Sequence, residues 1–255
     1  LSTKLTSITE TGTVAPITLT AAQYSSALTA KFSNFTATVT GVAAANATAI
    51  NANSKVTSFT ISDTAANITS NLASIVALST KLTSITETGT VTPITLNAAQ
   101  YSSALTAKFS NFTATVTGVA AANAAAIYSN AKVSSFAISD TAAKIQASLA
   151  SIASSRDKIT SITETGTVTP ITLTAAQYSS GLTAKFSNFT GTVTGVAAAN
   201  IATVLADSKI ASLTVSDSSA GLASSISSII SNVGKITSIT QTGTVEPISL
   251  TADQY

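Results

Sequence analysis

The feature that most constrains the fold is a long internal repeat. The phrase Lys-Leu-Thr-Ser-Ile-Thr-Glu-Thr-Gly-Thr-Val begins at Lys4 and at Lys81, and variants begin at Lys158 and Lys235, so successive copies start 77 residues apart. No insertion or deletion disturbs this spacing along the chain. Stacked units must keep a constant length to fit one another, whereas the loops of ordinary domains vary in length. The sequence therefore predicts a repeat architecture.

The spacing also sets the predicted boundaries of the units. We expect the end of a truncated repeat at 1–3, repeats at 4–80, 81–157 and 158–234, and the start of a truncated repeat at 235–255. Tyr255 corresponds to Tyr24 inside the first repeat, and Leu1 corresponds to Leu78 at the end of that repeat. Each end of the sequence is therefore expected to cut through a unit.

Each repeat is predicted to contain three strand–helix segments, and the first of them follows the Lys4 phrase. Thr20 and Gln23 have the spacing of a helix-capping box. Tyr24, Leu28 and Phe32 follow at a spacing of four, which is typical of one face of a helix.

The other two segments begin with alternating strands. The strand at 35–40 is expected to end at Gly41 and to lead into an Ala-rich helix over 42–50. A strand at 56–62 opens the third segment, where Asp63 is predicted to be the N-cap of the next helix.

Strands that alternate with helices predict parallel pairing through right-handed crossovers. The expected fold class is α/β, a right-handed solenoid of strand–helix units with one parallel sheet and a 77-residue repeat built of three rungs. The residues expected to point into its core are Ile8, Ala37, Val39, Phe59 and Ile61.

The outward face of this sheet is predicted to be a ladder of hydroxyl groups with rungs about 4.8 Å apart. Its candidate contact residues are Thr38, Thr40, Ser58 and Thr60, and Leu5 and Val42 are expected to interrupt the rows. Rows of Thr on a flat sheet resemble the ice-binding faces of some β-solenoid antifreeze proteins. The alternative interpretation is that Ser and Thr make a soluble sheet surface of low charge.

Reactive side chains are scarce. The sequence has no His and no Cys, so its many hydroxyls lack the usual base, and we predict no catalytic residue, no cofactor and no metal site. Asp63 could ligate calcium, but a helix cap is the favoured interpretation. Gly12 in Glu10-Thr11-Gly12-Thr13 indicates a turn or bulge in preference to a phosphate cradle. Tyr24 is expected to be a core residue.

The net charge and the hydropathy of the sequence exclude some classes of binding partner. A net charge of +2 argues against nucleic acid as a partner, and Ser, Thr and Asn interrupt the apolar runs, so we expect no membrane span. Some lysines could bind an anionic polymer, but a solvated face is favoured for them; they are Lys31, Lys55, Lys108, Lys132, Lys185 and Lys209. Asn-Phe-Thr glycosylation signals begin at Asn34, Asn111 and Asn188. They would matter only in a eukaryotic secretory route, and in a sequence this rich in Asn and Thr they are expected by chance.

The phrases at 56–68, 173–177 and 193–200 resemble repeats in very large bacterial surface proteins, the RTX-type or type I-secreted adhesins. The resemblance implies secretion without a cleaved N-terminal signal, an extracellular or cell-surface location, and a scaffold or adhesive role. The sequence departs from that family because it lacks the glycine- and aspartate-rich calcium nonapeptides. Any calcium requirement would therefore arise elsewhere.

These features lead to two hypotheses of different classes. The first is a structural repeat segment of an extracellular filament, surface layer or adhesin stalk, self-associating head-to-tail or laterally. The second is a binding module for ice or a polysaccharide that uses the Ser/Thr-rich sheet face, through a glycan or surface contact. An enzyme is the least favoured class.

Overall fold

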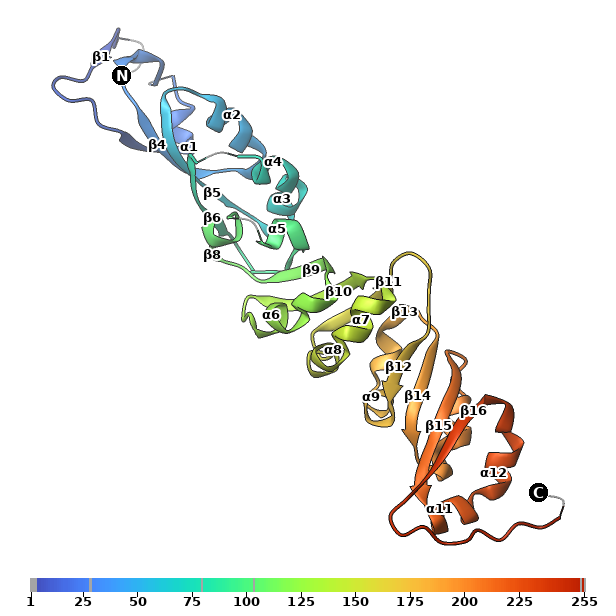
Figure 1. The fold of residues 1–255 in the computed structure, drawn as a ribbon. Helices are drawn as coiled ribbons and strands as arrows, with labels where there is room; N and C mark the ends of the chain where they lie inside the picture. Colours follow the sequence, from blue (N-terminus) through green and yellow to red (C-terminus); the bar gives the residue numbers. More distant parts are fainter. Residues whose placement is uncertain (1–3, 28, 79, 103, 253, 255) are drawn as a thin grey trace. The chain divides into compact units, whose positions relative to one another are not determined.

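The computed structural model describes residues 4–27, 29–78, 80–102, 104–252 and 254. The fold is mixed α/β, with several parallel sheets built from strand–helix units (Figure 1). The chain divides into two compact units, which are described separately below. The first comprises Leu1–Thr117 and Ala131–Ser134, and the second comprises Gly118–Asn130 and Ser135–Tyr255.

The first unit is built on a five-stranded parallel sheet. Its strand order is β2 (Ile17–Thr20), β4 (Ala37–Val42), β5 (Val56–Asp63), β6 (Leu82–Glu87) and β8 (Phe109–Asn111). A separate two-stranded parallel sheet joins β1 (Ile8–Thr9) to β3 (Phe32–Asn34). Strand β7 (Ile94–Asn97) pairs in parallel with β9 (Ala114–Val119) as part of another sheet. The α-helices are α1 (Ala21–Tyr24), α2 (Ala47–Ala52), α3 (Ala65–Ser70), α4 (Leu72–Val76) and α5 (Ala98–Ser102), with 3₁₀ helices at Thr29–Lys31, Ala44–Asn46 and Thr106–Lys108.

The second unit contains a four-stranded parallel sheet. Its order is β12 (Ile171–Thr174), β14 (Gly191–Val196), β15 (Ile210–Ser218) and β16 (Ile236–Thr242). Beside it, β11 (Ile159–Glu164) pairs with β10 (Val133–Asp140) and with β13 (Phe186–Asn188). The α-helices are α6 (Ala124–Ser129), α7 (Ala142–Ala147), α8 (Leu149–Ser154), α9 (Ala175–Ser179), α10 (Ile201–Leu205), α11 (Ser219–Ser224) and α12 (Ile226–Ser231), with 3₁₀ helices at Ala121–Asn123, Leu182–Lys185, Ala198–Asn200 and Val233–Lys235. No helix in the described ranges has the length and apolar character needed to cross a membrane.

The expectation of one sheet is corrected, because the structure has several. The chain leaves one sheet at the end of β6 and enters another at β7, through a short turn. In that turn Gly89 has a φ of +76°, and Pro93 precedes the first residue of β7. A left-handed glycine and a proline redirect the chain and so prevent β6 and β7 from forming one continuous strand.

The cores were predicted well for the central strands. Phe59, Ile61, Ala37 and Val39 are fully buried, as expected from the alternation of β4 and β5. Ile8 is only half-buried. The same alternation places Phe136, Ile138, Leu213 and Val215 in the core of the second unit. Burying each of these larger side chains stabilises the fold by about 1.5–3 kcal/mol.

The helix expected to extend through Phe32 is shorter in the structure. The capping box of Thr20 and Gln23 is confirmed, but α1 ends at Tyr24 and Phe32 begins β3, while Leu28 lies outside the described residues. Directly after α1, the hydroxyl of Ser26 donates to the carbonyl oxygen of Gln23 at 2.6 Å. Serine hydroxyls that bond nearby carbonyls compete with helix continuation, which explains the early end.

Two expectations around β4 are corrected by a bulge. Strand β4 continues through Gly41 to Val42, and Val42 is buried, so it does not interrupt an outer row. The register with β5 shifts between Val39 and Val42, and Gly41 has a φ of +69°. The extra residue moves Val42 onto the inward face. The Ala-rich helix starts two residues later than expected, as a 3₁₀ turn at Ala44–Asn46 that continues into α2.

Because of the bulge, we expect replacement of Gly41 by alanine to destabilise the fold. An added Cβ at this position would contact no atom within 4 Å, so Gly41→Ala should lose only the left-handed backbone preference, about 1–2 kcal/mol in a urea titration. Gly234→Ala is the matched control, because Gly234 is also unobstructed and lacks a positive φ. Equal losses at Gly41 and Gly234 would contradict this explanation.

Candidate functional site

The predicted outer-face residues lie on β4 and β5 of the first unit, and all are half-buried. Thr38 is in register with Ser58, and their hydroxyl oxygens lie 3.0 Å apart. On its other side Thr38 is in register with Thr18 of β2. The structure therefore brings Thr18, Thr38 and Ser58 into one row.

Thr40 and Thr60 do not extend this row. Because of the bulge at Gly41, Thr60 accepts a hydrogen bond from the backbone N–H of Gly41 at 3.1 Å and is in register with Ser84 of β6. The hydroxyl of Thr40 donates to the carbonyl oxygen of Leu19 at 3.4 Å. The four predicted residues thus form short hydroxyl–hydroxyl and hydroxyl–backbone contacts, not a single flat row.

The second unit repeats the two hydroxyl–backbone contacts, while its hydroxyl pair joins β12 to β14, the strands that correspond to β2 and β4. The hydroxyl oxygens of Thr172 and Thr192 lie 3.0 Å apart, and Thr214 accepts from the N–H of Gly195 at 3.0 Å. The hydroxyl of Thr194 donates to the carbonyl oxygen of Leu173 at 3.3 Å. Hydroxyls that are already paired with each other and with the backbone tie neighbouring strands together, which favours a structural role for the face.

The contribution of each hydroxyl pair should be small. Thr38→Val keeps the shape of the side chain and removes its bond to Ser58, which is half-exposed and can bond to water instead. We expect a loss of about 0.5–1 kcal/mol in unfolding free energy, measured by urea denaturation. A loss above about 2 kcal/mol would show that the row holds the sheet together more strongly than its geometry indicates.

Asp63 is not the N-cap that the sequence suggested. Thr64 caps α3, because its side chain accepts from the N–H of Asn67. One carboxylate oxygen of Asp63 accepts from the N–H of Thr64 at 2.8 Å and from the side-chain amide of Asn67, and the other accepts from the N–H of Ala44 at 2.9 Å. Burial acts to raise the pKa of Asp63, but these hydrogen bonds outweigh it and the pKa is lowered.

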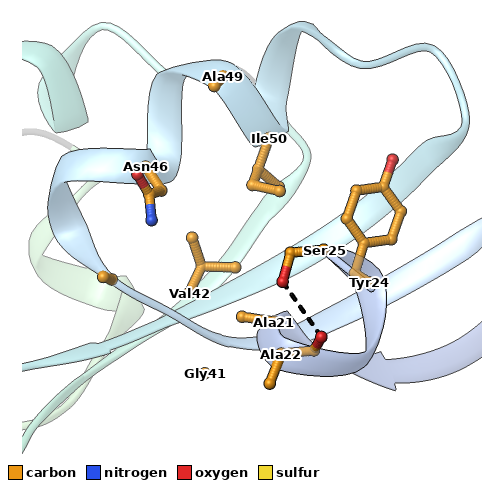
Figure 2. Close-up of a pocket in the computed structure, with 10 residues that line it drawn as sticks. Ala21, Ala22, Tyr24, Ser25, Gly41, Val42, Asn46, Ala49 and Ile50 are labelled. Atoms are coloured by element: carbon orange, nitrogen blue, oxygen red, sulfur yellow. Dashed lines mark hydrogen bonds between the residues drawn. The ribbon is translucent and has the colours of Figure 1, made fainter. Parts of the chain in front are cut away.

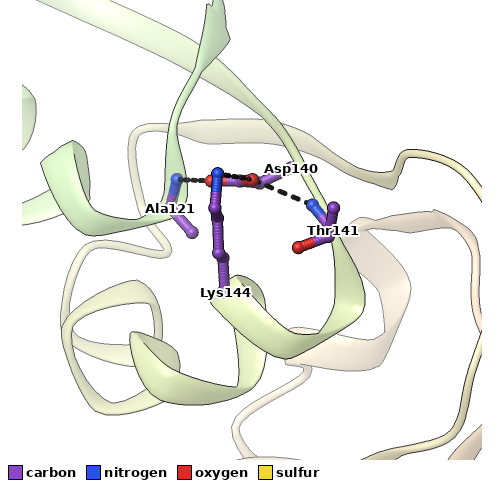
Figure 3. Close-up of polar contacts among 4 residues, drawn as sticks. All are labelled: Ala121, Asp140, Thr141 and Lys144. Atoms are coloured by element: carbon purple, nitrogen blue, oxygen red, sulfur yellow. Dashed lines mark hydrogen bonds and ion pairs between the residues drawn. The ribbon is translucent and has the colours of Figure 1, made fainter.

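Asp140 has the same function in the second unit (Figure 3). It accepts from the N–H of Ala121 at 3.1 Å and of Thr141 at 2.9 Å, and the ammonium of Lys144 lies 3.4 Å from its carboxylate. Burial opposes ionisation, yet these hydrogen bonds and the Lys144 charge lower the pKa of Asp140. Asp217 likewise accepts from the N–H of Ala198. These aspartates brace the 3₁₀ turns against the neighbouring helices.

The glutamate of the Glu-Thr-Gly turn is a feature that sequence reasoning missed. Glu87 and Glu164 are each only 3% exposed. One oxygen of Glu87 accepts from the N–H of Thr92 at 2.7 Å, and one oxygen of Glu164 accepts from Thr169 at 3.2 Å. The second oxygen of each is buried without a partner among the described atoms. Strand alternation could have revealed this, since Glu87 is two residues from the buried Ile85.

Burial raises the pKa of Glu164, and the hydrogen bond from Thr169 only partly opposes that effect. A shifted carboxyl group can mark a catalytic site, but such a site also needs a second reacting group. In the described ranges, no group of three or more acidic, His or Cys residues is placed to hold a metal ion. The arrangement of these acids thus indicates turn formation.

Several of the lysines contact other parts of the protein, which residues on a simple solvated face do not need to do. Lys108 and Lys209 donate to backbone carbonyls, with Lys209 2.9 Å from the oxygen of Phe186. Lys55 lies 5.3 Å from the ring centre of Phe35, and Lys132 has a similar position over Phe112. Lys31 and Lys185 lie in the last turns of 3₁₀ helices.

The asparagines of the glycosylation signals also form hydrogen bonds with backbone groups. The side chain of Asn111 accepts from the N–H of Glu87 and donates to its carbonyl oxygen, both at 2.9 Å. Asn34 binds Glu10 and Asn188 binds Glu164 in the same way. Both polar atoms of each of these amide side chains are therefore bound to the backbone of a preceding strand segment.

A cavity of about 410 Å³ lies between α1 and α2 in the first unit (Figure 2). Most of its lining is small or apolar, with Val42 at the end of β4, Ile50 on α2 and Tyr24 at one side. Asn46 adds an amide, and the hydroxyl of Ser25 already donates to the carbonyl oxygen of Ala22 at 3.1 Å. Burial raises the pKa of Tyr24. None of the described residues that line this cavity is charged.

Comparison with protein-family models, with curated proteins and with solved structures found no match for this chain.

Proposed function

We propose that this chain is a structural repeat segment of an extracellular bacterial filament, surface layer or adhesin stalk, and that it acts without catalysis. The main support for the proposal is that the polar side chains form hydrogen bonds within the fold. In both units, aspartates, asparagines, lysines and hydroxyls bind the backbone of neighbouring segments. Side chains committed to the scaffold are not available as reacting groups.

The proposed architecture is a right-handed solenoid with a 77-residue repeat. Three observations support it: the unbroken spacing of the sequence, the parallel pairing of strands, and the recurrence of one element order. Strands β4 and β14 share their bulged glycine, and β5 and β15 share the core position of Phe59 and Leu213. The resemblance of the repeats to bacterial surface proteins supports the extracellular location.

Cryo-electron microscopy of the material that contains this chain tests the structural role. We expect continuous filaments or a layer with strands spaced about 4.8 Å along the axis. Discrete compact particles that carry a measurable enzymatic activity would overturn the proposal.

The alternative is a binding module for ice or a polysaccharide on the Ser/Thr face. The row of Thr18, Thr38 and Ser58 supports it, while the internal pairing of the hydroxyls counts against it. Replacing Thr38, Thr40 and Thr60 with bulky residues should abolish such binding and leave the circular dichroism spectrum unchanged. Ice or glycan binding by the parent chain, lost in this variant, would establish the alternative.

A further inference from the structure

Tyr24 lies at the junction of two cavities in the first unit. One is the cavity of about 410 Å³ between α1 and α2 (Figure 2), and the other has a volume of about 280 Å³ and is also lined by Phe35, Asn53 and Lys55. We call the two cavities together the Tyr24 groove. Its lining combines aromatic, amide and ammonium groups, and none of the described residues that form it is acidic.

The walls of the groove are formed within the first repeat. All of the lining residues fall between Ala21 and Lys55. Helix α1 packs on β4 and α2 packs on β5, and β4 is paired with β2 on one side and with β5 on the other. The groove is therefore held in place by paired strands.

Several polar groups of the groove are not used to brace the fold. Asn46 is exposed, and its side chain caps no N–H of α2. The side-chain oxygen of Asn53 accepts from the N–H of Lys55 at 3.0 Å, which leaves the NH₂ group of this amide to donate to a ligand. The exposed ammonium of Lys55 lies 5.3 Å from the ring centre of Phe35, an arrangement that holds the charge at the surface.

These groups match the chemistry of an acidic sugar. A sugar ring has an apolar face that can pack on an aromatic ring, and its hydroxyls can accept hydrogen bonds from amides. The half-buried ring of Tyr24 offers such a surface, and Asn46 and Asn53 offer the amides. The ammonium of Lys55 can bind a carboxylate through a charge-assisted hydrogen bond.

The third repeat differs at two of the equivalent positions. Asp207 replaces Asn53 and keeps its backbone contact, because its carboxylate accepts from the N–H of Lys209 at 3.0 Å. Burial raises the pKa of Tyr178, and the charge of Asp207 raises it further, so this carboxylate lies near the tyrosine. The ammonium of Lys209 donates to the carbonyl oxygen of Phe186. An acidic ligand would therefore meet a negative charge in the third repeat.

We propose that the Tyr24 groove binds a carboxylated oligosaccharide, with a uronic-acid ring packed on Tyr24 and its carboxylate at Lys55. This binding site goes beyond the structural role. It is also distinct from the Ser/Thr face, because none of its lining residues belongs to the row of Thr18, Thr38 and Ser58.

Nuclear magnetic resonance of the chain with isotope-labelled tyrosine rings tests the site, because the five tyrosines provide local probes. The ligands are oligogalacturonate and, for comparison, an uncharged glucose oligomer of the same length. Oligogalacturonate should shift the Tyr24 signal and leave the Tyr178 signal in place, and added salt should weaken the binding. The glucose oligomer should bind at least about twofold more weakly, since it forms no ion pair with Lys55.

Two substitutions test the charge of the groove. Lys55→Gln should weaken oligogalacturonate binding about two- to fivefold, the range expected for one exposed ion pair. Lys4→Gln is the matched control, because it removes the same charge from an exposed lysine outside the groove and should leave the affinity unchanged. Asn53→Asp should weaken binding at least as much as Lys55→Gln. It should also keep the fold, since Asp207 makes the same backbone contact.

The ring of Tyr24 is tested by a pair of variants. Tyr24→Leu should weaken binding about tenfold, because it removes the aromatic face. Tyr24→Phe retains that face and should bind more tightly than Tyr24→Leu. Circular dichroism checks that each variant is folded, and Lys55→Gln and Asn53→Asp keep the test decisive if Tyr24→Leu does not fold.

Four outcomes overturn the site: no shift of the Tyr24 signal, equal shifts of the Tyr24 and Tyr178 signals, equal losses in Lys55→Gln and Lys4→Gln, or an equal Tyr24 shift with polyglutamate, which would indicate a general anion site. Oligogalacturonate binding that moves no tyrosine signal and is lost on replacing Thr38, Thr40 and Thr60 would also overturn it, by assigning the glycan to the Ser/Thr face. The structural role is tested separately by microscopy.

Discussion

Replacing Phe136 with alanine should lower the unfolding free energy of the second unit by about 3–5 kcal/mol. The Phe136 ring lies on β10, is fully buried, and is in register with Ile159 of the neighbouring strand. Truncation removes the buried ring from the core and leaves a cavity that the surrounding strands can only partly fill. The lost burial and the cavity each destabilise the fold.

The repeat supplies the control for this prediction. The next repeat has Leu213 at the position of Phe136, and Leu213 is also fully buried. Phe136→Leu should therefore cost less than about 1.5 kcal/mol. Native-state hydrogen exchange measures both losses in β10 and β11. If the alanine and leucine variants lost the same stability, the ring would not fill the core as the structure shows.

Replacing Glu164 with glutamine should stabilise the protein by about 1–2 kcal/mol at pH 7, because a buried carboxylate oxygen without a partner is costly. The pKa of Glu164 is raised above its usual value of 4.5, chiefly by burial. A group with a raised folded pKa contributes stability that is fully present below the unfolded pKa and is lost as the pH rises through the folded pKa. The parent chain should therefore lose stability as the pH rises above about 4.5, and the variant should lose less.

The chain already contains the amide at an equivalent position. Gln241 donates to the hydroxyl of Ser219 and, at 2.8 Å, to the carbonyl oxygen of Glu246. The residue that corresponds to Ser219 near Glu164 is Ala142, so a glutamine at 164 has the second of these bonds available, to the carbonyl oxygen of Thr169. Glu246→Gln is the control, because Glu246 is exposed and its replacement should change stability by less than about 0.5 kcal/mol. Urea titrations at pH 4 and pH 7 measure both variants. A Glu164→Gln variant that is less stable than the parent at pH 7 would contradict the proposed cost of ionisation.

The parts of the fold that were predictable are those set by local pattern. Alternation placed Phe59 and Val39 inside, and the Thr20–Gln23 spacing identified a real capping box. The Phe32–Asn34 strand was missed because a spacing of four from Tyr24 also fits a helix, and only pairing with β1 decides between them. The bulge that buries Val42 depends on the φ of Gly41, which the alternation pattern does not reveal.

In the candidate site, too, the local pattern was predictable from the sequence and the register between strands was not. Sequence alternation correctly placed Thr38 and Ser58 on one face of the sheet, where they meet. It did not show that Thr60 accepts from Gly41, because that contact depends on the register between β4 and β5. The role of Asp63 also depends on an atom distant in the sequence, the N–H of Ala44.

We propose that the 77-residue repeats stack as one continuous solenoid. Small-angle X-ray scattering tests it on the chain and on variants with one or two further copies of residues 81–157 inserted after Asp157. We expect the maximum dimension to grow in equal steps of at least about 14 Å per copy, with an unchanged cross-section. A radius of gyration that grows only as a compact globule does, with about the 0.38 power of chain length, would contradict it.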